Sequence, residues 1–171
     1  EVPRHFIVRR PCGGVHSRLQ LNWDTDADLE PMLAQPDLVE DHLADRLDLI
    51  RATRTDVGKH ALVWCISNLV PLRQASSFGL PIVFYEHLRD HPRREIPRIF
   101  AAIGRPFQES VFDALGTPSS TSRDSPRARS GAGRDTAWQR DLSAAQITEI
   151  RAIVDSFGLG HLYGDSTEPL A

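Results

Sequence analysis

Lysine is almost absent from this sequence of 171 residues. Lys59 is the only lysine among 20 basic residues, so an anion site in this chain would have to be built from arginine. The 23 acidic residues give a net charge of -3 and a pI near 6.2. Without a basic excess, we expect no nucleic-acid partner and no binding to an anionic membrane surface.

Cysteines and long apolar runs are also scarce. Cys12 and Cys65 are too few for a disulfide framework and lack the spacing of metal ligands, so we expect no metal and a reducing, cytoplasmic location. The longest strongly apolar run, 61–66, is too short to cross a bilayer, and no signal-peptide pattern occurs. The length suits a single domain, 1–171, with a sizeable core.

The first segment with chemical interest follows directly on the N-terminus. The apolar run Phe6–Val8 predicts a buried strand, Pro11 and the glycines after it predict a break, and 15–23 predicts a helix. Arg9 and Ser17 can converge at the start of this helix, where free N–H groups favour an anion such as a phosphate. The alternative is a basic turn with solvated arginines.

The remaining segments predict an α/β fold with a parallel sheet flanked by helices. Its expected elements are a loop over 24–35, helices over 39–50, 60–72, 92–103 and 109–115, a strand over 81–85, a basic loop over 116–137, and a last helix that ends at Gly158. Asp37 with Glu40 and Ser143 with Gln146 have the spacing of capping boxes. Because two strands do not make a sheet, we expect further strands upstream of Glu1 or in weaker segments of this chain.

Three motifs together resemble the sulfotransferase family that uses 3′-phosphoadenosine 5′-phosphosulfate (PAPS). The first is Arg9 with Ser17, before and within a helix. The second runs over 84–104 and contains Phe-Tyr-Glu-His-Leu, then Pro-Arg-Arg-Glu-Ile and Ile-Gly. The third is Arg129-Ser130-Gly131 with Trp138, where Ser130 replaces the usual lysine. Helix 61–73, with Trp64, also resembles bacterial members of the group.

The resemblance implies a P-loop-NTPase-like sulfotransferase fold that lacks its N-terminal part in this chain. PAPS would be the sulfuryl donor and 3′-phosphoadenosine 5′-phosphate (PAP) the product, with a small-molecule or glycan hydroxyl or amine as acceptor and no metal. Arg9 and Ser17 would hold the 3′-phosphate, and Tyr85 would contact the adenine. Arg129 and the backbone of Ser130 and Gly131 would cover the phosphate in a lid formed by the basic loop, 116–137.

The family's glycine-rich phosphosulfate loop and general base do not precede Arg9, so no catalytic residue is assigned. Of the seven histidines, we expect His16 to be structural or a secondary contact at the phosphate turn, and His60 to lie at the surface or cap a helix. The resemblance implies that Glu86 is structural and anchors a neighbouring helix or loop. Two alternatives stay open. One is an inactive fragment or nucleotide-binding remnant of this fold, and the other is a different α/β nucleotide-binding protein, although a Gly-x-x-x-x-Gly-Lys-Ser/Thr loop is missing.

Overall fold

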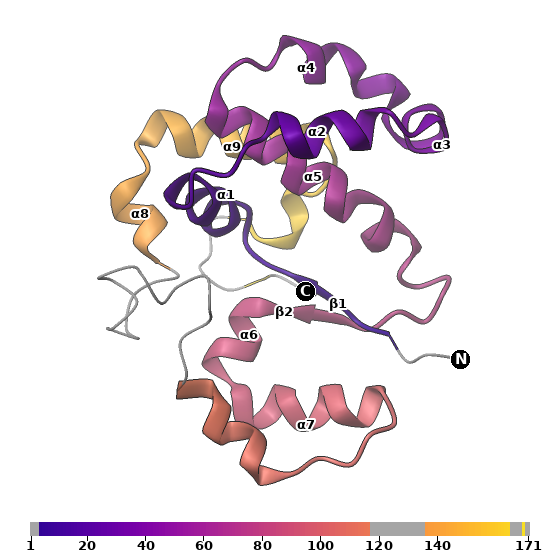
Figure 1. Cartoon of the computed structure of the whole chain (residues 1–171), viewed down its shortest axis with the longest axis vertical. Coiled ribbons are helices and arrows are strands. Elements are labelled where there is room, and N and C mark those ends of the chain that lie inside the picture. The colour runs from indigo at the N-terminus through magenta and orange to yellow at the C-terminus, as the bar shows by residue number, and fades with distance from the viewer. Residues whose placement is uncertain (1–3, 117–135, 165–168, 170–171) are drawn as a thin grey trace.

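The computed structural model describes residues 4–116, 136–164 and 169. Between its helices lies a two-stranded parallel sheet of β1 (Phe6–Val8) and β2 (Ile82–Phe84) (Figure 1). Phe6 lies opposite Ile82, and Val8 lies opposite Phe84. The two predicted strands and their parallel direction are confirmed, and the chain is a mostly helical α/β structure around this small sheet.

Helices lie on both sides of the sheet (Figure 1). On one side α5 (Asp56–Gln74) packs against α1 (Pro11–Gln20) and α9 (Ala144–Ser156), and α1 also contacts α8 (Ala137–Asp141). On the other side lie α6 (Tyr85–Asp90) and α7 (Pro92–Ala102). The strands therefore end between two groups of helices, and the segments that follow them are held from both sides.

α1 begins earlier than the sequence predicted, at Pro11 instead of residue 15. A proline suits the first helical position, because its missing N–H has no helical partner there and its φ is already helical. The N–H of Gly14 donates to the carbonyl of Arg10 at 2.9 Å. The strand therefore ends before Pro11 as predicted, but Pro11 and the glycines after it belong to the helix and not to a break before it. Gly14 instead makes room for Trp64, whose Cδ1 would lie 3.2 Å from a Cβ at this position.

The segment 24–35 is not the predicted loop, because it contains α2 (Asp26–Leu33). Asp24 Oδ1 accepts a hydrogen bond of 2.9 Å from the N–H of Asp26 at the start of this helix. A carboxylate satisfies free N–H groups and complements the positive end of a helix, so aspartate here begins a helix. Leu29 is buried and anchors α2 on the core.

The predicted helix over 39–50 is helical but irregular. It is divided into α3 (Pro36–Leu38), the π-helical turn η1 (Val39–Leu43), the 3₁₀ turn η2 (Ala44–Arg46) and α4 (Leu47–Ala52). The capping box predicted for Asp37 and Glu40 is wrong, because Pro36 is already the first helical residue and the preceding Gln35 makes no side-chain cap. Leu43 and Ile50 are buried and attach this irregular segment to the core.

α5 is longer than predicted at both ends. Thr55 caps it, with the hydroxyl accepting from the N–H of Gly58 at 2.9 Å. The predicted end at residue 72, beside Pro71, is too early, because the helix continues to Gln74 with Pro71 inside it. A proline removes the hydrogen bond to the carbonyl four residues earlier, which belongs to Ser67. Ser67 is exposed, so water can satisfy that carbonyl and the helix continues.

The segments on the other side of the sheet agree with the prediction only in part. Tyr85 was predicted to end the strand, but it is the first residue of α6, a helix that was not predicted. α7 begins at Pro92, and Gly104 with a φ of +64° follows its end. The residues after it form the 3₁₀ segment η3 (Glu109–Gly116) instead of an α-helix. Phe107 stacks edge-on against Phe100 and Phe112, with centroids 5.7 and 5.4 Å apart, which packs η3 against α7.

The C-terminal helix is predicted correctly. Ser143 N donates to Gln146 Oε1 at 2.8 Å and Gln146 N donates to Ser143 Oγ at 3.2 Å, which confirms the capping box. Gly158 follows α9 with a φ of +72°, a conformation that favours glycine. The 3₁₀ turn η6 (Gly160–Leu162) then brings the chain back to the sheet.

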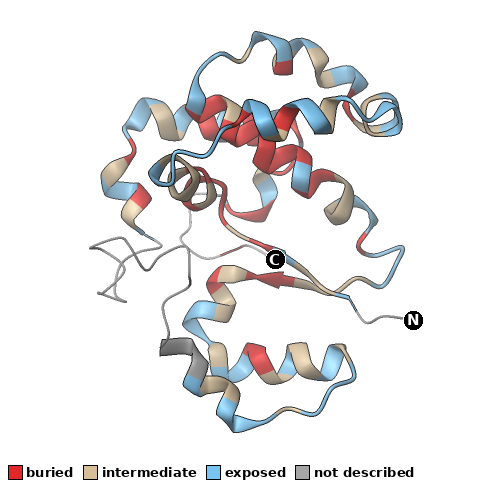
Figure 2. Cartoon of the chain, in the orientation of Figure 1, coloured by how far each residue is buried: buried red, intermediate tan, exposed pale blue. Residues whose placement is uncertain are grey.

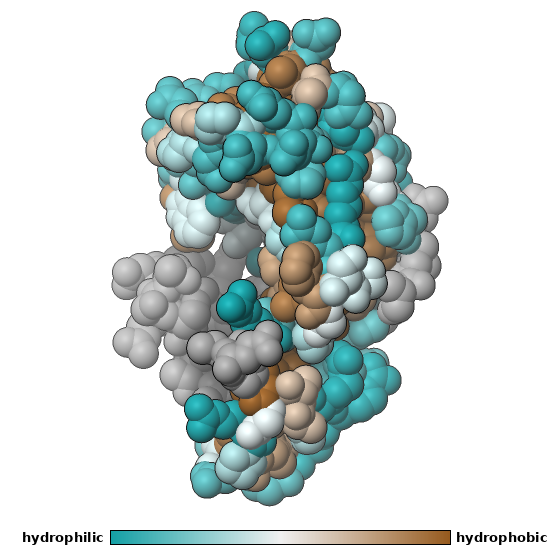
Figure 3. Space-filling view, turned by 90° about the vertical axis from the view of Figure 1, so that its right-hand side faces the viewer, coloured by the Kyte–Doolittle hydropathy of each residue, from teal (hydrophilic) through white to brown (hydrophobic). Residues whose placement is uncertain are grey.

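Buried residues concentrate in α5 and the helices around it (Figure 2). Some apolar side chains nevertheless reach the surface, with Phe78 76% and Ile7 45% exposed. The face with the loop between α5 and β2 shows hydrophobic atoms at mid-height, between hydrophilic regions above and below (Figure 3). Among the helices that the structure describes, none combines the length and hydrophobicity that a membrane crossing requires.

Candidate functional site

The candidate site lies where the two strands end. Because β1 and β2 are parallel and Val8 pairs with Phe84, the next residues, Arg9 and Tyr85, leave the sheet side by side. The Arg9 guanidinium lies over the Tyr85 ring, 4.8 Å from its centroid. Ligands of open α/β sheets bind at the carboxyl ends of strands. The structure therefore brings together two of the residues that the sequence proposed for a nucleotide site.

Ser17 lies farther along α1. It is half-buried and is the seventh residue of this helix. Its hydroxyl makes no hydrogen bond to a described residue, so it can donate to a ligand. The three lid residues, Arg129, Ser130 and Gly131, lie outside the described residues.

Glu86 joins the ends of the two strands. Its side chain is 1% exposed, and its two oxygens have different partners. Oε1 accepts from the backbone N–H of Arg10 at 2.7 Å, and Oε2 accepts from the Tyr163 hydroxyl at 3.0 Å. The carboxylate thus holds the segment after β1, the first turn of α6 and the chain after η6 in one arrangement. This agrees with the anchoring role expected for Glu86.

Arg10 is a site residue that the sequence analysis overlooked. It is 4% exposed, and its guanidinium lies 4.9 Å from the ring centroid of Tyr163 and 5.7 Å from that of Trp138. Arg9, in contrast, is half-buried. The alternation of a strand gave a usable indication, because side chains of successive extended residues point to opposite sides. If Arg9 faces a ligand, Arg10 faces the protein.

Trp64 supports the same segment from α5. Its indole Nε1 donates to the backbone carbonyl of Arg9 at 2.8 Å, and the ring lies against Gly14. The sequence placed Trp64 in the resemblance but gave no contact for it. The peptide groups of Arg9 and Arg10 are therefore fixed by two buried partners from distant parts of the chain, an indole and the carboxylate of Glu86.

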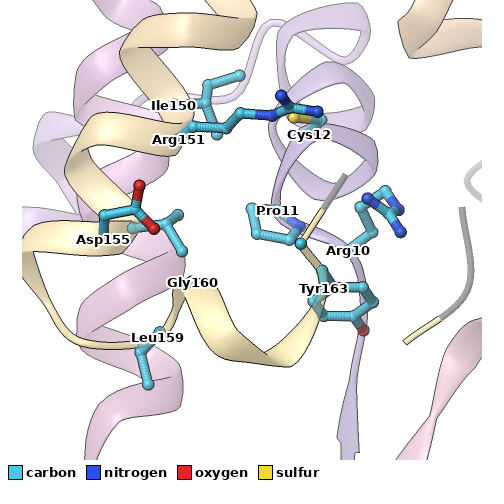
Figure 4. Close-up of a pocket in the computed structure, with 11 residues that line it drawn as sticks. Arg10, Pro11, Cys12, Ile150, Arg151, Asp155, Leu159, Gly160 and Tyr163 are labelled. Carbon is cyan, nitrogen blue, oxygen red and sulfur yellow. The ribbon is translucent and has the colours of Figure 1, made fainter. Parts of the chain in front are cut away.

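A cavity of about 230 Å³ opens beside the start of α1. Its wall contains Arg10, Cys12, Arg151, Asp155 and Tyr163, among other residues (Figure 4). Arg151 extends from α9 toward Cys12 on α1 (Figure 4). Burial raises the pKa of the Cys12 thiol, although the charges of Arg151 and Arg10 oppose the shift. A neutral, buried thiol is a poor nucleophile, so Cys12 is not assigned a chemical role.

A second cavity, of about 430 Å³, lies between the end of α5, β2 and η6. Neither cavity wall includes Arg9, Ser17 or Tyr85. Of the two, the first comes nearest to the candidate site through Arg10. The described residues at the strand ends therefore form an open surface and do not enclose a cavity there.

The histidines near α1 have structural contacts. His16 Nε2 lies 3.0 Å from Asp141 Oδ2 on α8, as expected of a structural residue. His60 was expected at the surface or at a cap, but it is 2% exposed and its Nδ1 accepts from Arg18 Nε at 3.1 Å. Burial, and then the charge of Arg18, lowers the pKa of His60. Among the residues that the structure describes, we therefore assign no general base.

Comparison with known proteins gives no family for the chain. No family model matches it, and neither a curated protein nor a solved structure matches it. Within the residues that the structure describes, no cluster of histidine, cysteine, aspartate or glutamate could hold a metal ion. The assignment of a function therefore rests on the chemistry of the strand ends.

Proposed function

We propose that this chain is part of a PAPS-dependent sulfotransferase with a P-loop-NTPase-like sulfotransferase fold, and that it binds the adenosine 3′-phosphate half of the donor. The single observation that supports the proposal is the position of the Arg9 guanidinium over the Tyr85 ring at the adjacent ends of two parallel strands. This places a fixed cation and an aromatic ring where ligands bind in α/β sheets. A nucleotide with an extra phosphate needs both groups.

Arginine is suited to the phosphate because its planar guanidinium can donate two parallel hydrogen bonds. The contact with Tyr85 orients this group, and a stacked cation contributes about 0.5–1 kcal/mol at an exposed site. The hydroxyl of Ser17, which has no described partner, is the second donor for the phosphate. The hydrogen bonds from Trp64 and to Glu86 hold the backbone that carries Arg9.

In the proposed reaction a sulfuryl group moves from the 5′-phosphate of the donor to an acceptor hydroxyl or amine. A new bond forms from the acceptor oxygen or nitrogen to sulfur, the bond from sulfur to the phosphate oxygen breaks, and the acceptor loses its proton to a base. The described residues bind the departing nucleotide, and catalysis requires positioning and stabilisation of charge, as in phosphoryl transfer. The general base and the acceptor-binding residues are not among them.

Calorimetric titration tests the proposal with two nucleotides, PAP and 5′-AMP, which differ by the 3′-phosphate. We expect PAP to bind more tightly than 5′-AMP. Arg9→Ala should lower the affinity for PAP by about tenfold or more, because a charged hydrogen bond contributes about 1.5–3 kcal/mol. Arg51→Ala is the matched control, since the Arg51 side chain is 72% exposed and lies on α4, away from the strand ends.

Two outcomes distinguish the alternatives. Selective binding of PAP that depends on Arg9, without release of PAP from PAPS in the presence of acceptors, would favour a nucleotide-binding remnant over an active enzyme. Equal affinity for PAP and 5′-AMP in the folded chain would contradict the proposal, because the 3′-phosphate would then make no contact.

A further inference from the structure

The cavity of about 430 Å³ has the size of a small-molecule site. It is bounded by the end of α5, by β2, and by the segment from the end of α9 through η6. Three of its wall residues carry basic side chains and six carry apolar ones, and these are Arg46, Arg73, His161, Leu72, Ile82, Phe84, Phe157, Leu159 and Leu162. The tenth is Gly158, and none of the ten is acidic.

The apolar side chains form a wall that belongs to the core. Phe157 is 1% exposed and Phe84 is 7% exposed, and both belong to the cluster of buried residues that forms the hydrophobic core. Such a wall is fixed by its packing before any ligand binds. An aromatic or aliphatic body would gain from contact with it, because the contact removes apolar surface from water.

Arg46 contributes a positively charged guanidinium to this wall, and two contacts fix its position. Its guanidinium lies 5.4 Å from the centroid of the Phe157 ring, and one of its terminal nitrogens pairs with Asp45. Its Nε is buried and has no hydrogen-bond acceptor among the described residues. A buried donor without a partner destabilises the structure, and an anion that approaches the guanidinium offsets part of that cost.

Arg73 and His161 add two exposed basic groups at the edge of the cavity. The ring nitrogen Nδ1 of His161 lies 3.0 Å from the carbonyl of Gly158. A carbonyl only accepts, so Nδ1 carries the hydrogen, and this contact orients the ring. The exposed Arg73 side chain can close on a bound anion without any change in the fold.

We propose that this cavity binds a small molecule with an apolar, aromatic or aliphatic body and one anionic head group, a sulfonate, sulfate or carboxylate. The apolar wall selects the body, and the three basic groups with no acidic neighbour in the wall select the charge. The volume limits the ligand to a small molecule. This proposal does not depend on the nucleotide site, whose residues are not in this wall.

Calorimetry with naphthalene-2-sulfonate and the neutral naphthalene-2-methanol tests the proposal, because the two compounds share a ring and differ in charge. We expect the sulfonate to bind with a 1:1 ratio and the alcohol to bind about tenfold more weakly or worse, as expected for a charge-assisted hydrogen bond. Equal affinities would overturn the proposal, because the basic groups would then not recognise the anion.

Two variants locate the binding. Arg73→Gln keeps a long polar side chain at an exposed position. We expect it to lower the affinity for the sulfonate by about three- to tenfold, as for the loss of one partly exposed charged contact. Arg105→Gln is the matched control, because Arg105 is exposed and outside the cavity. A loss that is the same in both variants would reflect net charge alone and would overturn the site.

Discussion

The two sides of the sheet are built in different ways. In α5 eleven of nineteen residues are buried, whereas in α7 only two of eleven are buried, Glu95 and Ile96 (Figure 2). The first side has a layered core with α1 and α9, and the second is a thin cover with exposed arginines. Stability should therefore depend on the first side far more than on the second.

Because of this difference, the residues at the two strand ends are supported in different ways. β1 leads into α1, which is held by Trp64 of α5, while β2 leads into α6 on the thinner side. Glu86, within α6, is tied across to Arg10 and Tyr163. Arg9 is thus supported from the core, and Tyr85 keeps its position through the buried carboxylate next to it.

The largest effect should come from truncating the core side. Leu69 on α5 is 0% exposed, so Leu69→Ala should lower the free energy of unfolding by about 2–5 kcal/mol through lost burial and a cavity. Ile99 on α7 is only half-buried, and Ile99→Ala should cost about 1 kcal/mol, a fraction of the value for a fully buried side chain.

Urea unfolding followed by circular dichroism measures both values. Equal losses in the two variants would contradict the comparison and would mean that the cover is as important to the fold as the core. Separate transitions for the two sides would sharpen it, because they would show that the cover unfolds first.

The second prediction concerns the tie between the two sides. Tyr163→Phe removes the hydrogen bond to Glu86 but keeps the ring against Phe84 and Arg10. Because a buried carboxylate loses an O–H donor, we expect a loss of about 1.5–3 kcal/mol in the free energy of unfolding.

The chain provides its own control, because it has two tyrosines. Tyr85→Phe also removes a hydroxyl, but that hydroxyl makes no hydrogen bond to a described residue, so its stability should change by less than about 0.5 kcal/mol. A loss of the same size in both variants would show that Glu86 does not need Tyr163.

The sequence analysis predicted what depends on local pattern. The runs Phe6–Val8 and 81–85 gave both strands, and Ser143 with Gln146 gave the start of α9, since apolar runs and capping boxes act within a few residues. It was wrong at Pro11, which was expected in a break between the strand and the helix, and at Pro71, beside which α5 was expected to end. Both positions avoid the usual cost, one as the first residue of α1 and the other four residues after the exposed Ser67.

The sequence predicted only part of the candidate site, because only part of it depends on local pattern. Arg9 and Tyr85 follow strands, so their meeting at the strand ends could be inferred from topology. Contacts across the chain could not, because Tyr163 lies 77 residues from Glu86 and Trp64 lies 55 residues from Arg9. Local spacing carries no information on such pairs, and the buried state of His60 depends on Arg18 in the same way.

The smallest effect is the change of stability with pH, and the two sides of the sheet should show it in different pH ranges. On the core side, burial and the charge of Arg18 lower the pKa of His60 from its ordinary value near 6.5. The unfolded chain then binds more protons than the folded one just below pH 6.5, so stability should fall as the pH falls through this value. His60→Gln should reduce that dependence.

On the cover side, burial raises the pKa of Glu95, but the hydrogen bonds from Arg98 and Arg94 outweigh it and lower the pKa below its ordinary value near 4.5. Its contribution to stability is present above pH 4.5 and should be lost only as the pH falls below that value. Unfolding midpoints measured from pH 8 to pH 3 for the wild type, His60→Gln and Glu95→Gln test both windows. Each substitution should remove the loss of stability only in the pH range of its own residue. If stability fell in one pH range alone and either substitution removed that loss, the two sides would respond to protons as one unit.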